Sequence, residues 1–228
     1  MKRRNFLLGA GACLACGTAR AERPLPVFCS IDRAFDSTNF RHFGTSGDTG
    51  LDRALIAEVR KINAVFSIRP GYRYIDDADS PNAFAMQRTI IANTHGTVLL
   101  GLNLIRGEMS TSYGGAAVAG IAAHEGAHIH QYFSGLADRL NGATARNTEL
   151  HADYLAGYYF AQDGRTSRSL DVFARSLFSK GDYAYNEPDH HGSPEERQAA
   201  MKAGYAAGGQ SADLAQVSDK GVAYVLAN

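Results

Sequence analysis

A short string in the middle of the chain has the residue types and the spacing of a hydrolytic metal site. It runs from His124 to His128 and reads H-E-G-A-H, which fits the pattern H-E-x-x-H. Two histidines four residues apart lie on one face of a helix, so both imidazoles can bind one metal ion. Glu125 follows the first histidine, where its carboxylate can take a proton from water without entering the ligand set. The string predicts a zinc-dependent hydrolase site with Glu125 as the general base.

Two histidines leave such a site one ligand short, because catalytic zinc usually takes three protein ligands and keeps one position for water. The next predicted helix carries Glu149 and Asp153, four residues apart and therefore on one face. Glu149 can complete the ligand set, and Asp153 can accept a hydrogen bond from a ligand histidine. His151 lies about 200° around the helix from Glu149 and is expected to point away. We expect one Zn²⁺ per chain, bound by His124, His128 and Glu149 with ligand atoms about 3–4 Å apart.

Two further histidines, His190 and His191, stand in a predicted loop directly before a helix that begins at Pro194. A histidine in such a loop could donate a hydrogen bond to the oxyanion that forms during hydrolysis. Arg197, on the helix, could bind a ligand carboxylate through two of its nitrogens. The loop register does not decide which of the two histidines faces the zinc ion.

Helical periodicity predicts the elements that must position these residues. Apolar residues recur at helical spacing over Thr49–Phe66. An Ala-rich segment over Tyr113–Phe133 has a 3.6-residue period and places the H-E-x-x-H string in mid-helix. Three more helices are predicted after it, namely Thr144–Gln162, Ser167–Lys180 and Pro194–Tyr205. The tail from Gly208 onward gives no clear pattern.

The segment between the first two predicted helices has the character of a small sheet. Tyr72–Ile75 is a candidate short strand, and residues 76–81 have the composition of a loop. Asn82–Ile91 and Gly96–Leu104 are candidate strands separated by a hairpin-like break. The order of elements predicts one α+β domain over residues 22–228, in which a small β-sheet with an edge strand lies beside a helical half that carries the zinc-binding helices.

Together these pieces resemble a gluzincin zinc metallopeptidase, and above all the soluble peptidase domains related to the CAAX prenyl peptidases and the HtpX-like proteases. In that group H-E-x-x-H is followed by E-x-x-x-D on the next helix, and then by a histidine six residues before an arginine, which is the spacing of His191 and Arg197. The E-L-x-A-D and H-G-S-x-x-x-R strings are also similar to the neutral zinc metallopeptidases. The group also carries an Asn-Ala-Phe-Ala string on the strand that lines the substrate cleft, here Asn82, Ala83, Phe84 and Ala85.

The resemblance covers roughly residues 49–207. It implies a zincin-like fold, an endopeptidase acting on a peptide or protein, and the ligand set, base and supporting Asp153 given above. It further implies that His191 donates to the oxyanion and that Arg197 orients Glu149. An edge strand with the Asn-Ala-Phe-Ala string would bind an extended peptide by strand addition. The chain departs from the group at Gly192, where proline is usual, and it lacks the group's membrane helices, so a prenyl-protein substrate is not implied.

Residues 1–21 are interpreted as an export signal and kept apart from the fold. Their basic start, Lys2-Arg3-Arg4, is followed by an apolar stretch that is too short for a stable membrane span. The string from Arg3 to Leu7 resembles a twin-arginine signal, so we expect a periplasmic or secreted protein. The residues before Cys16 are similar to a lipoprotein box, which leaves a lipid anchor at Cys16 as an alternative.

Composition excludes several classes of partner. The 228 residues are 45% hydrophobic and 20% charged, as in an ordinary globular protein, and the mature part offers no candidate membrane span. The 23 basic and 23 acidic residues balance, and four of the basic ones lie in the first 21 residues, so no nucleic-acid footprint is expected. Cys29 is alone after the signal, which excludes a disulfide framework.

Two rival interpretations stay open. A non-catalytic, chaperone-like binding or assembly protein of the cell envelope could keep a structural zinc site, which has four protein ligands. His130, His151 or His190 could then supply the fourth. Glu125 argues against this, since a structural site needs no carboxylate beside its first histidine. A protein without any metal is the other rival, and it predicts that Glu149 does not face the H-E-x-x-H helix.

Overall fold

The computed structural model describes residues 41–78, 80–112, 114–178, 183, 187, 190–211 and 213–228. The interpreted export signal, the possible lipid anchor at Cys16 and residues 22–40 lie outside the described residues. Within them the chain forms an α+β fold that is mostly helical and has one small mixed sheet. None of the helices in this part combines the length and the apolar character that crossing a bilayer requires.

The helices of the described residues follow the predicted periodicity. They are α1 (Thr49–Phe66), α2 (Leu102–Met109), α3 (Gly114–Ser134), α4 (Leu136–Arg139), α5 (Arg146–Gln162), α6 (Ser167–Phe178), α7 (Pro194–Gly208) and α8 (Leu214–Ala227). The five predicted helices correspond to α1, α3, α5, α6 and α7, with ends within three residues of the predicted ones. The pattern did not predict α2, α4 or α8, and α8 occupies the tail that gave no clear pattern.

The sheet has four strands among the described residues, in the order β1-β2-β4-β3. They are β1 (His42–Phe43), β2 (Gly71–Ile75), β3 (Ala83–Met86) and β4 (Thr97–Gly101). β2 and β4 run parallel, with Gly71 opposite Thr97, whereas β3 pairs antiparallel with β4, with Ala83 opposite Leu100. β3 therefore lies at one edge of the sheet and forms the expected hairpin-like pair with β4.

Two predicted strands are shorter than the sequence suggested. The strand expected over Asn82–Ile91 ends at Met86, and the one expected over Gly96–Leu104 ends at Gly101, where α2 follows at once. The reason for the second difference is Asp77, which is buried and distant in sequence. Its carboxylate accepts hydrogen bonds from the backbone N–H groups at the start of α2, at 2.7 Å and 3.0 Å, and so caps that helix.

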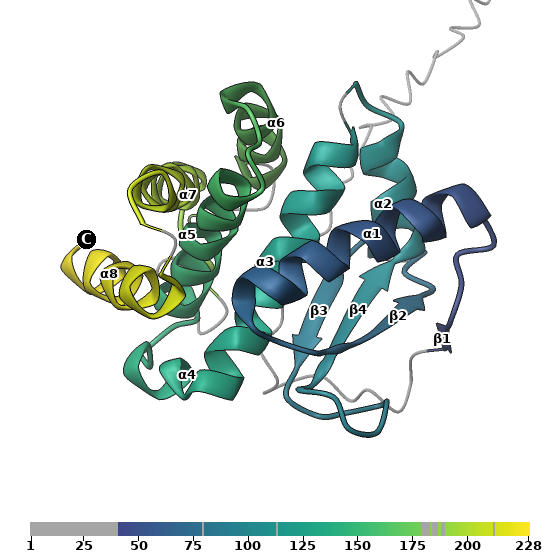
Figure 1. Ribbon diagram of the computed structural model, residues 1–228, viewed down its shortest axis with the longest axis horizontal. Coiled ribbons are helices and arrows are strands. Elements are labelled where there is room, and N and C mark those ends of the chain that lie inside the picture. The colour runs from purple at the N-terminus through teal and green to yellow at the C-terminus, as the bar shows by residue number, and fades with distance from the viewer. Residues whose placement is uncertain are drawn as a thin grey trace, which may run out of the picture.

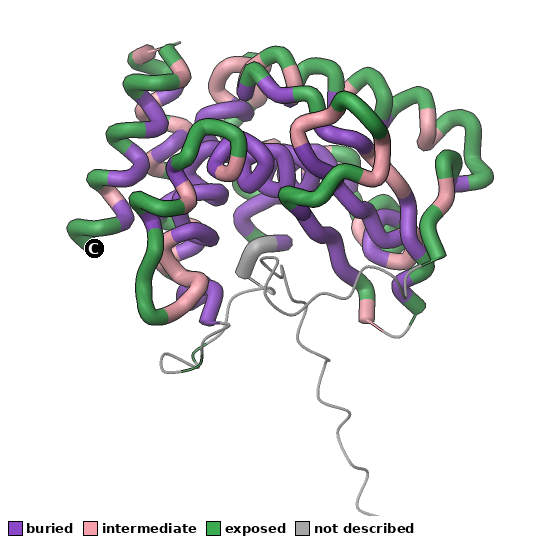
Figure 2. Tube along the Cα trace, turned by 90° about the horizontal axis from the view of Figure 1, so that it is seen from below, coloured by how far each residue is buried: buried purple, intermediate pink, exposed green. Residues whose placement is uncertain are grey.

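Helix α3 is the centre of the molecule. In Figure 1, α1 and the strands lie on one side of it, and α5, α7 and α8 lie on the other. Its residues from Ala117 to Gln131 are buried throughout, so α3 meets neighbours all round rather than on a single stripe. Figure 2 shows the same arrangement, with buried residues along the central elements and exposed ones on the outer helices.

Helices α5 and α7 cross at very close range because glycines face each other there. A Cβ atom on Gly157 would lie 1.9 Å from the carbonyl oxygen of Met201. A Cβ atom on Gly204 would lie 1.7 Å from the carbonyl oxygen of Tyr154. No side chain fits at either position, so the two backbones can touch only where both helices carry glycine. This contact fixes α7 against the helix that carries Glu149 and Asp153.

Candidate metal centre

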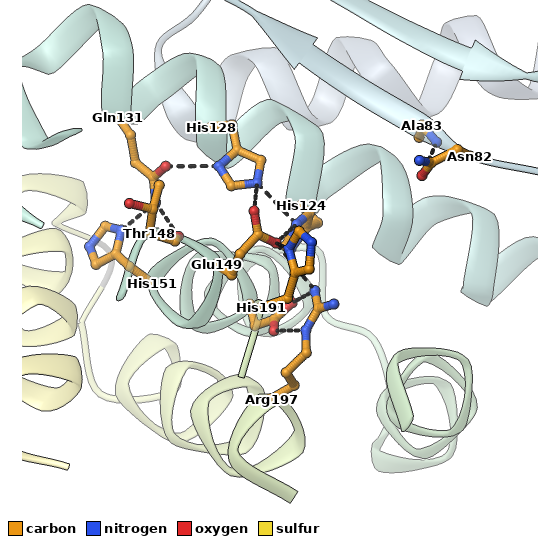
Figure 3. Close-up of polar contacts among 11 residues, drawn as sticks. Asn82, Ala83, His124, His128, Gln131, Thr148, Glu149, His151, His191 and Arg197 are labelled. Atoms are coloured by element: carbon orange, nitrogen blue, oxygen red, sulfur yellow. Dashed lines mark hydrogen bonds and ion pairs between the residues drawn. The ribbon is translucent and has the colours of Figure 1, made fainter. Parts of the chain in front are cut away.

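The structure brings His124 and His128 from α3 and Glu149 from α5 to one place, as Figure 3 shows. The Nε2 atoms of the two histidines lie 3.1 Å apart. Glu149 Oε2 lies 3.2 Å from His124 Nε2, and Glu149 Oε1 lies 3.3 Å from His128 Nε2. All three side chains are buried. They form a group that could hold a metal ion, and Glu149 does face the H-E-x-x-H helix.

Local structure explains this convergence. The two histidines are one helical turn apart on α3, and their rings meet edge to face, with centroids 4.6 Å apart. Glu149 lies in the first turn of α5, which packs directly on α3. The loop between the helices, with the short α4, reverses the chain so that the beginning of α5 meets the second half of α3.

The geometry fits a metal ion. In a tetrahedral site with metal–ligand bonds of about 2.0–2.1 Å, neighbouring ligand atoms are about 3.3 Å apart. The two imidazole Nε2 atoms lie 3.1 Å apart, and each lies a similar distance from a different oxygen of Glu149, 3.2 Å from Oε2 for His124 and 3.3 Å from Oε1 for His128. Two imidazole nitrogens and a carboxylate form a donor set that zinc accepts and that other divalent first-row metals accept too. The described residues thus define a metal-binding group without selecting the metal.

The second ring nitrogen of each histidine has its own partner. His124 Nδ1 lies 2.8 Å from Asp153 Oδ1, which is the place the sequence suggested for Asp153. His128 Nδ1 lies 2.9 Å from Gln131 Oε1. Sequence reasoning missed Gln131, although its position three residues after His128 on the same helix was a usable signal. Each partner orients a ring so that Nε2 points towards Glu149.

Arg197 contacts both acidic residues of α5. It donates to Asp153 twice, from Nε at 2.7 Å and from a terminal nitrogen at 3.0 Å. The same terminal nitrogen lies 3.7 Å from Glu149 Oε2. The two-nitrogen contact predicted for a ligand carboxylate is therefore made with Asp153, and the contact with Glu149 is the longer one. Arg197 reaches the ligands chiefly through the residue that orients His124.

The loop before α7 carries both candidate donor histidines, and both are buried. His191 lies beside the group, with Nδ1 3.6 Å from Glu149 Oε2 (Figure 3). The backbone N–H of His190 donates to the carbonyl of Glu187. Gly192 has φ +91°, and its Cβ would lie 2.8 Å from Leu150 on α5. Proline, usual in the resembling group, has φ fixed near −65°, so this chain turns the loop differently.

The remaining predicted residues are placed as follows. Glu125 is buried on α3, with 2% of its surface exposed, about 60° around the helix from His128.

Asn82, on the strand side of Figure 3, is separate from the metal-binding group, and its side chain accepts a hydrogen bond from the N–H of Ala83. Ala83 and Ala85 pack in the main core beside α3, whereas Phe84 packs in a small cluster on the other side of the sheet. β3 therefore packs against α3, the helix that carries His124 and His128, through the small side chains of Ala83 and Ala85.

Charges in the group favour a bound cation. Burial lowers the pKa of His124, but the carboxylates of Asp153 and Glu149 outweigh burial and raise that pKa to about 10. Burial raises the pKa of Glu149, yet the neighbouring histidines hold it well below its ordinary range. The same balance, with Arg197 as the main cation, lowers the pKa of Asp153. Positive charge is therefore drawn to His124, where either a proton or a metal ion can supply it.

A comparison of the chain with protein-family models gives no match, and comparisons with curated proteins and with solved structures give none either. The resemblance to gluzincins therefore stands on the sequence motifs alone. The fold and the site define an α+β protein with a buried group of two histidines and one glutamate that could hold a metal ion.

Proposed function

We propose that this protein is an exported, zinc-dependent endopeptidase of the gluzincin type. The observation that carries the proposal is the convergence of both motif histidines with Glu149, a residue selected from the sequence for that role and found within 3.3 Å of each histidine. The carboxylate that follows the first histidine supports hydrolysis rather than a purely structural site. The twin-arginine-like start of the sequence supports export.

The ligands fit a zinc ion, which when bound polarises a carbonyl and makes water easier to deprotonate. Glu125 accepts the proton of the attacking water and returns it to the leaving amine. His191 donates a hydrogen bond to the carbonyl oxygen as negative charge develops there, a role supported by its burial beside Glu149. Asp153 holds the His124 ring, and Arg197 holds Asp153.

The substrate lies in extended form along β3, which carries Asn82, Ala83, Phe84 and Ala85. Support comes from the position of β3 at one end of the strand order and from its packing against α3, the helix of the metal ligands. Recognition runs through backbone hydrogen bonds, because the side chains of this segment are buried. Such a site accepts unfolded polypeptides of varied sequence.

The test is metal content combined with cleavage of an unfolded, fluorescently labelled polypeptide by the purified full chain. We expect about one zinc ion per chain, cleavage that a chelator abolishes, and recovery of cleavage when Zn²⁺ is returned. Zinc content of one with no cleavage of any unfolded polypeptide would favour the binding or assembly protein instead. A chain purified and refolded without retaining any divalent metal would contradict the whole proposal.

A further inference from the structure

A chain of buried polar contacts leads from the metal-binding group to the C-terminal helix. It starts at His128, whose Nδ1 lies 2.9 Å from Gln131 Oε1. Gln131 Nε2 donates to the carbonyl of Thr148 at 2.9 Å and lies 3.0 Å from His151 Nδ1. His151 Nε2 lies 3.1 Å from the carbonyl of Ser218 on α8. The left half of Figure 3 shows Gln131, Thr148 and His151 in this arrangement.

The two carbonyl oxygens fix the direction of every hydrogen bond in the chain. A carbonyl only accepts, so His151 carries its proton on Nε2 and donates to Ser218. Its Nδ1 then accepts from Gln131. The Thr148 carbonyl also requires the amide nitrogen of Gln131 on its side, so Oε1 must face His128. His128 therefore donates from Nδ1, which directs the lone pair of Nε2 towards Glu149.

Packing keeps this chain rigid. Gln131 and His151 have no exposed surface, and Thr148 and Ser218 are buried as well. Helix α8 approaches His151 through Gly221, where a Cβ would lie 3.0 Å from the imidazole. Because water has little access, Gln131 cannot exchange its protein partners for solvent without leaving buried groups unsatisfied. The amide is held in one orientation from two sides.

We propose that Gln131 is the positioning residue for the metal ligand His128, and that His151 and the Ser218 carbonyl of α8 hold Gln131 in place. The inference rests on the metal-binding part of the proposed function and not on peptide hydrolysis. It makes the C-terminal helix part of the metal centre, although α8 supplies no ligand in the described residues.

Affinity for Zn²⁺ alone, measured on the full chain by competition with a chromophoric chelator, is the first test. Gln131→Met keeps the size of the side chain but removes every hydrogen bond, and it should weaken Zn²⁺ binding by about 10- to 100-fold. Gln131→Glu keeps an acceptor for His128 and loses both N–H donors. It should therefore lower the unfolding midpoint but leave Zn²⁺ affinity within about threefold of the parent. Equal affinity losses in both variants would mean that Gln131 acts only on stability and would overturn the proposal.

His130 provides the matched control. It precedes Gln131 on α3, is also buried, and also contacts α8, through the Ser218 hydroxyl at 3.3 Å from Nε2. His130→Phe should lower stability with no change in Zn²⁺ affinity. His151→Leu should weaken Zn²⁺ binding by about three- to tenfold, because the Thr148 carbonyl still holds one N–H of Gln131. A loss of affinity in His130→Phe as large as in Gln131→Met would overturn the proposal.

The second test needs no variant that could fail to fold. Nitrogen-15 chemical shifts of the histidine rings in the metal-free parent protein report which ring nitrogen carries the proton. We expect His128 to be protonated on Nδ1 and His151 on Nε2. A His128 ring without a proton on Nδ1 would overturn the proposal, whether or not Nε2 is protonated. Neither test measures cleavage, so a protein that meets both expectations and cleaves nothing leaves this inference intact and contradicts only the peptidase.

Discussion

At the scale of single residues, Glu125 is the proposed proton acceptor and His124 is a proposed metal ligand. Substituting each of them in turn separates the two roles. Glu125→Gln keeps the shape of the side chain but removes the proton acceptor. Zinc content should stay near one per chain, while cleavage should fall by roughly 10²–10⁴. His124→Gln is the contrasting variant, since it should lose both metal and cleavage. Loss of metal from Glu125→Gln would show that Glu125 is a ligand, and unchanged cleavage would show that it is not the base.

His191 and its neighbour His190 form a natural pair for testing the oxyanion donor. His191→Phe fills the same buried space without a donor and should lower turnover by roughly 10²–10³, with zinc content unchanged. His190→Phe is the control and should have a much smaller effect, because it is His191 that lies 3.6 Å from Glu149. A larger loss of turnover in His190→Phe would assign the donor role to that residue.

Arg197 should matter for stability as well as for the site. Arg197→Met leaves the buried Asp153 carboxylate without its guanidinium, which should cost about 3–5 kcal/mol in the free energy of unfolding. Arg146 is a matched control because it also joins α5 to α7, through Glu196, in a pair that is partly exposed. Arg146→Met should cost less than about 1 kcal/mol. Equal losses in denaturant titrations of the two variants would show that Asp153 does not need its buried partner.

Among the site residues, sequence spacing predicted those that share a helix face. His124 with His128 and Glu149 with Asp153 follow directly from the helical repeat. The bidentate partner of Arg197 did not follow, because Glu149 and Asp153 lie on the same face and only the crossing of α5 with α7 decides which of them is nearer. Gln131 was missed for a different reason. Its spacing from His128 places it on the same helix face, but glutamine has no metal-ligand signature, and its role depends on Thr148 and His151.

At the scale of elements, local signals predicted helices well and strand ends poorly. The bounds of α1 agree with the pattern, and Asp48 caps its first turn from the adjacent position. The change from β4 to α2 was missed because the residue that caps α2, Asp77, is 26 residues away from Asn103. No periodicity within a short apolar segment can report a cap that comes from a distant loop.

This distant cap gives a prediction of its own. Asp77 accepts hydrogen bonds from the backbone N–H groups of Asn82, Asn103 and Leu104, and all three lose their acceptor in Asp77→Ala. That variant should lower the free energy of unfolding by about 3 kcal/mol or more. Asp48→Ala removes an exposed cap from α1 and should cost about 1 kcal/mol. Chemical denaturation of both variants measures the difference, and equal costs would contradict a structural role for the buried carboxylate.

At the scale of the whole molecule, the metal-binding group links segments that no local pattern connects. Its ligands come from α3 and α5, its supporting arginine from α7, and the chain of contacts behind His128 ends on α8. The order of the predicted elements was sufficient for the α+β class and for the pairing of the two ligand helices. It was not sufficient for α8. The buried residues Val217, Val222 and Val225 do recur at helical spacing, but the continuous apolar run over residues 222–227 hides that face among other apolar side chains.

Two buried histidines should give the metal-free protein opposite responses to pH. The folded-state pKa of His124 is raised to about 10, so its stabilising effect is fully present below about pH 6.5 and is lost as the pH rises towards 10. Burial lowers the folded-state pKa of His151 to about 4, so its neutral ring costs stability as the pH falls from about 6.5 to 4. Each histidine contributes a slope of at most about 1.4 kcal/mol per pH unit. Stability without metal should therefore be greatest near neutral pH.

Zinc should change only one side of this profile. A metal ion on Nε2 of His124 replaces the proton there, so the alkaline decline should flatten when Zn²⁺ is present, while the acidic decline from His151 remains. Denaturant midpoints from pH 4 to 10, measured with a chelator and again with excess Zn²⁺, provide the comparison. His151→Leu should reduce the acidic decline in both series. An alkaline decline that is the same with and without Zn²⁺ would mean that the proton and the metal do not compete at His124.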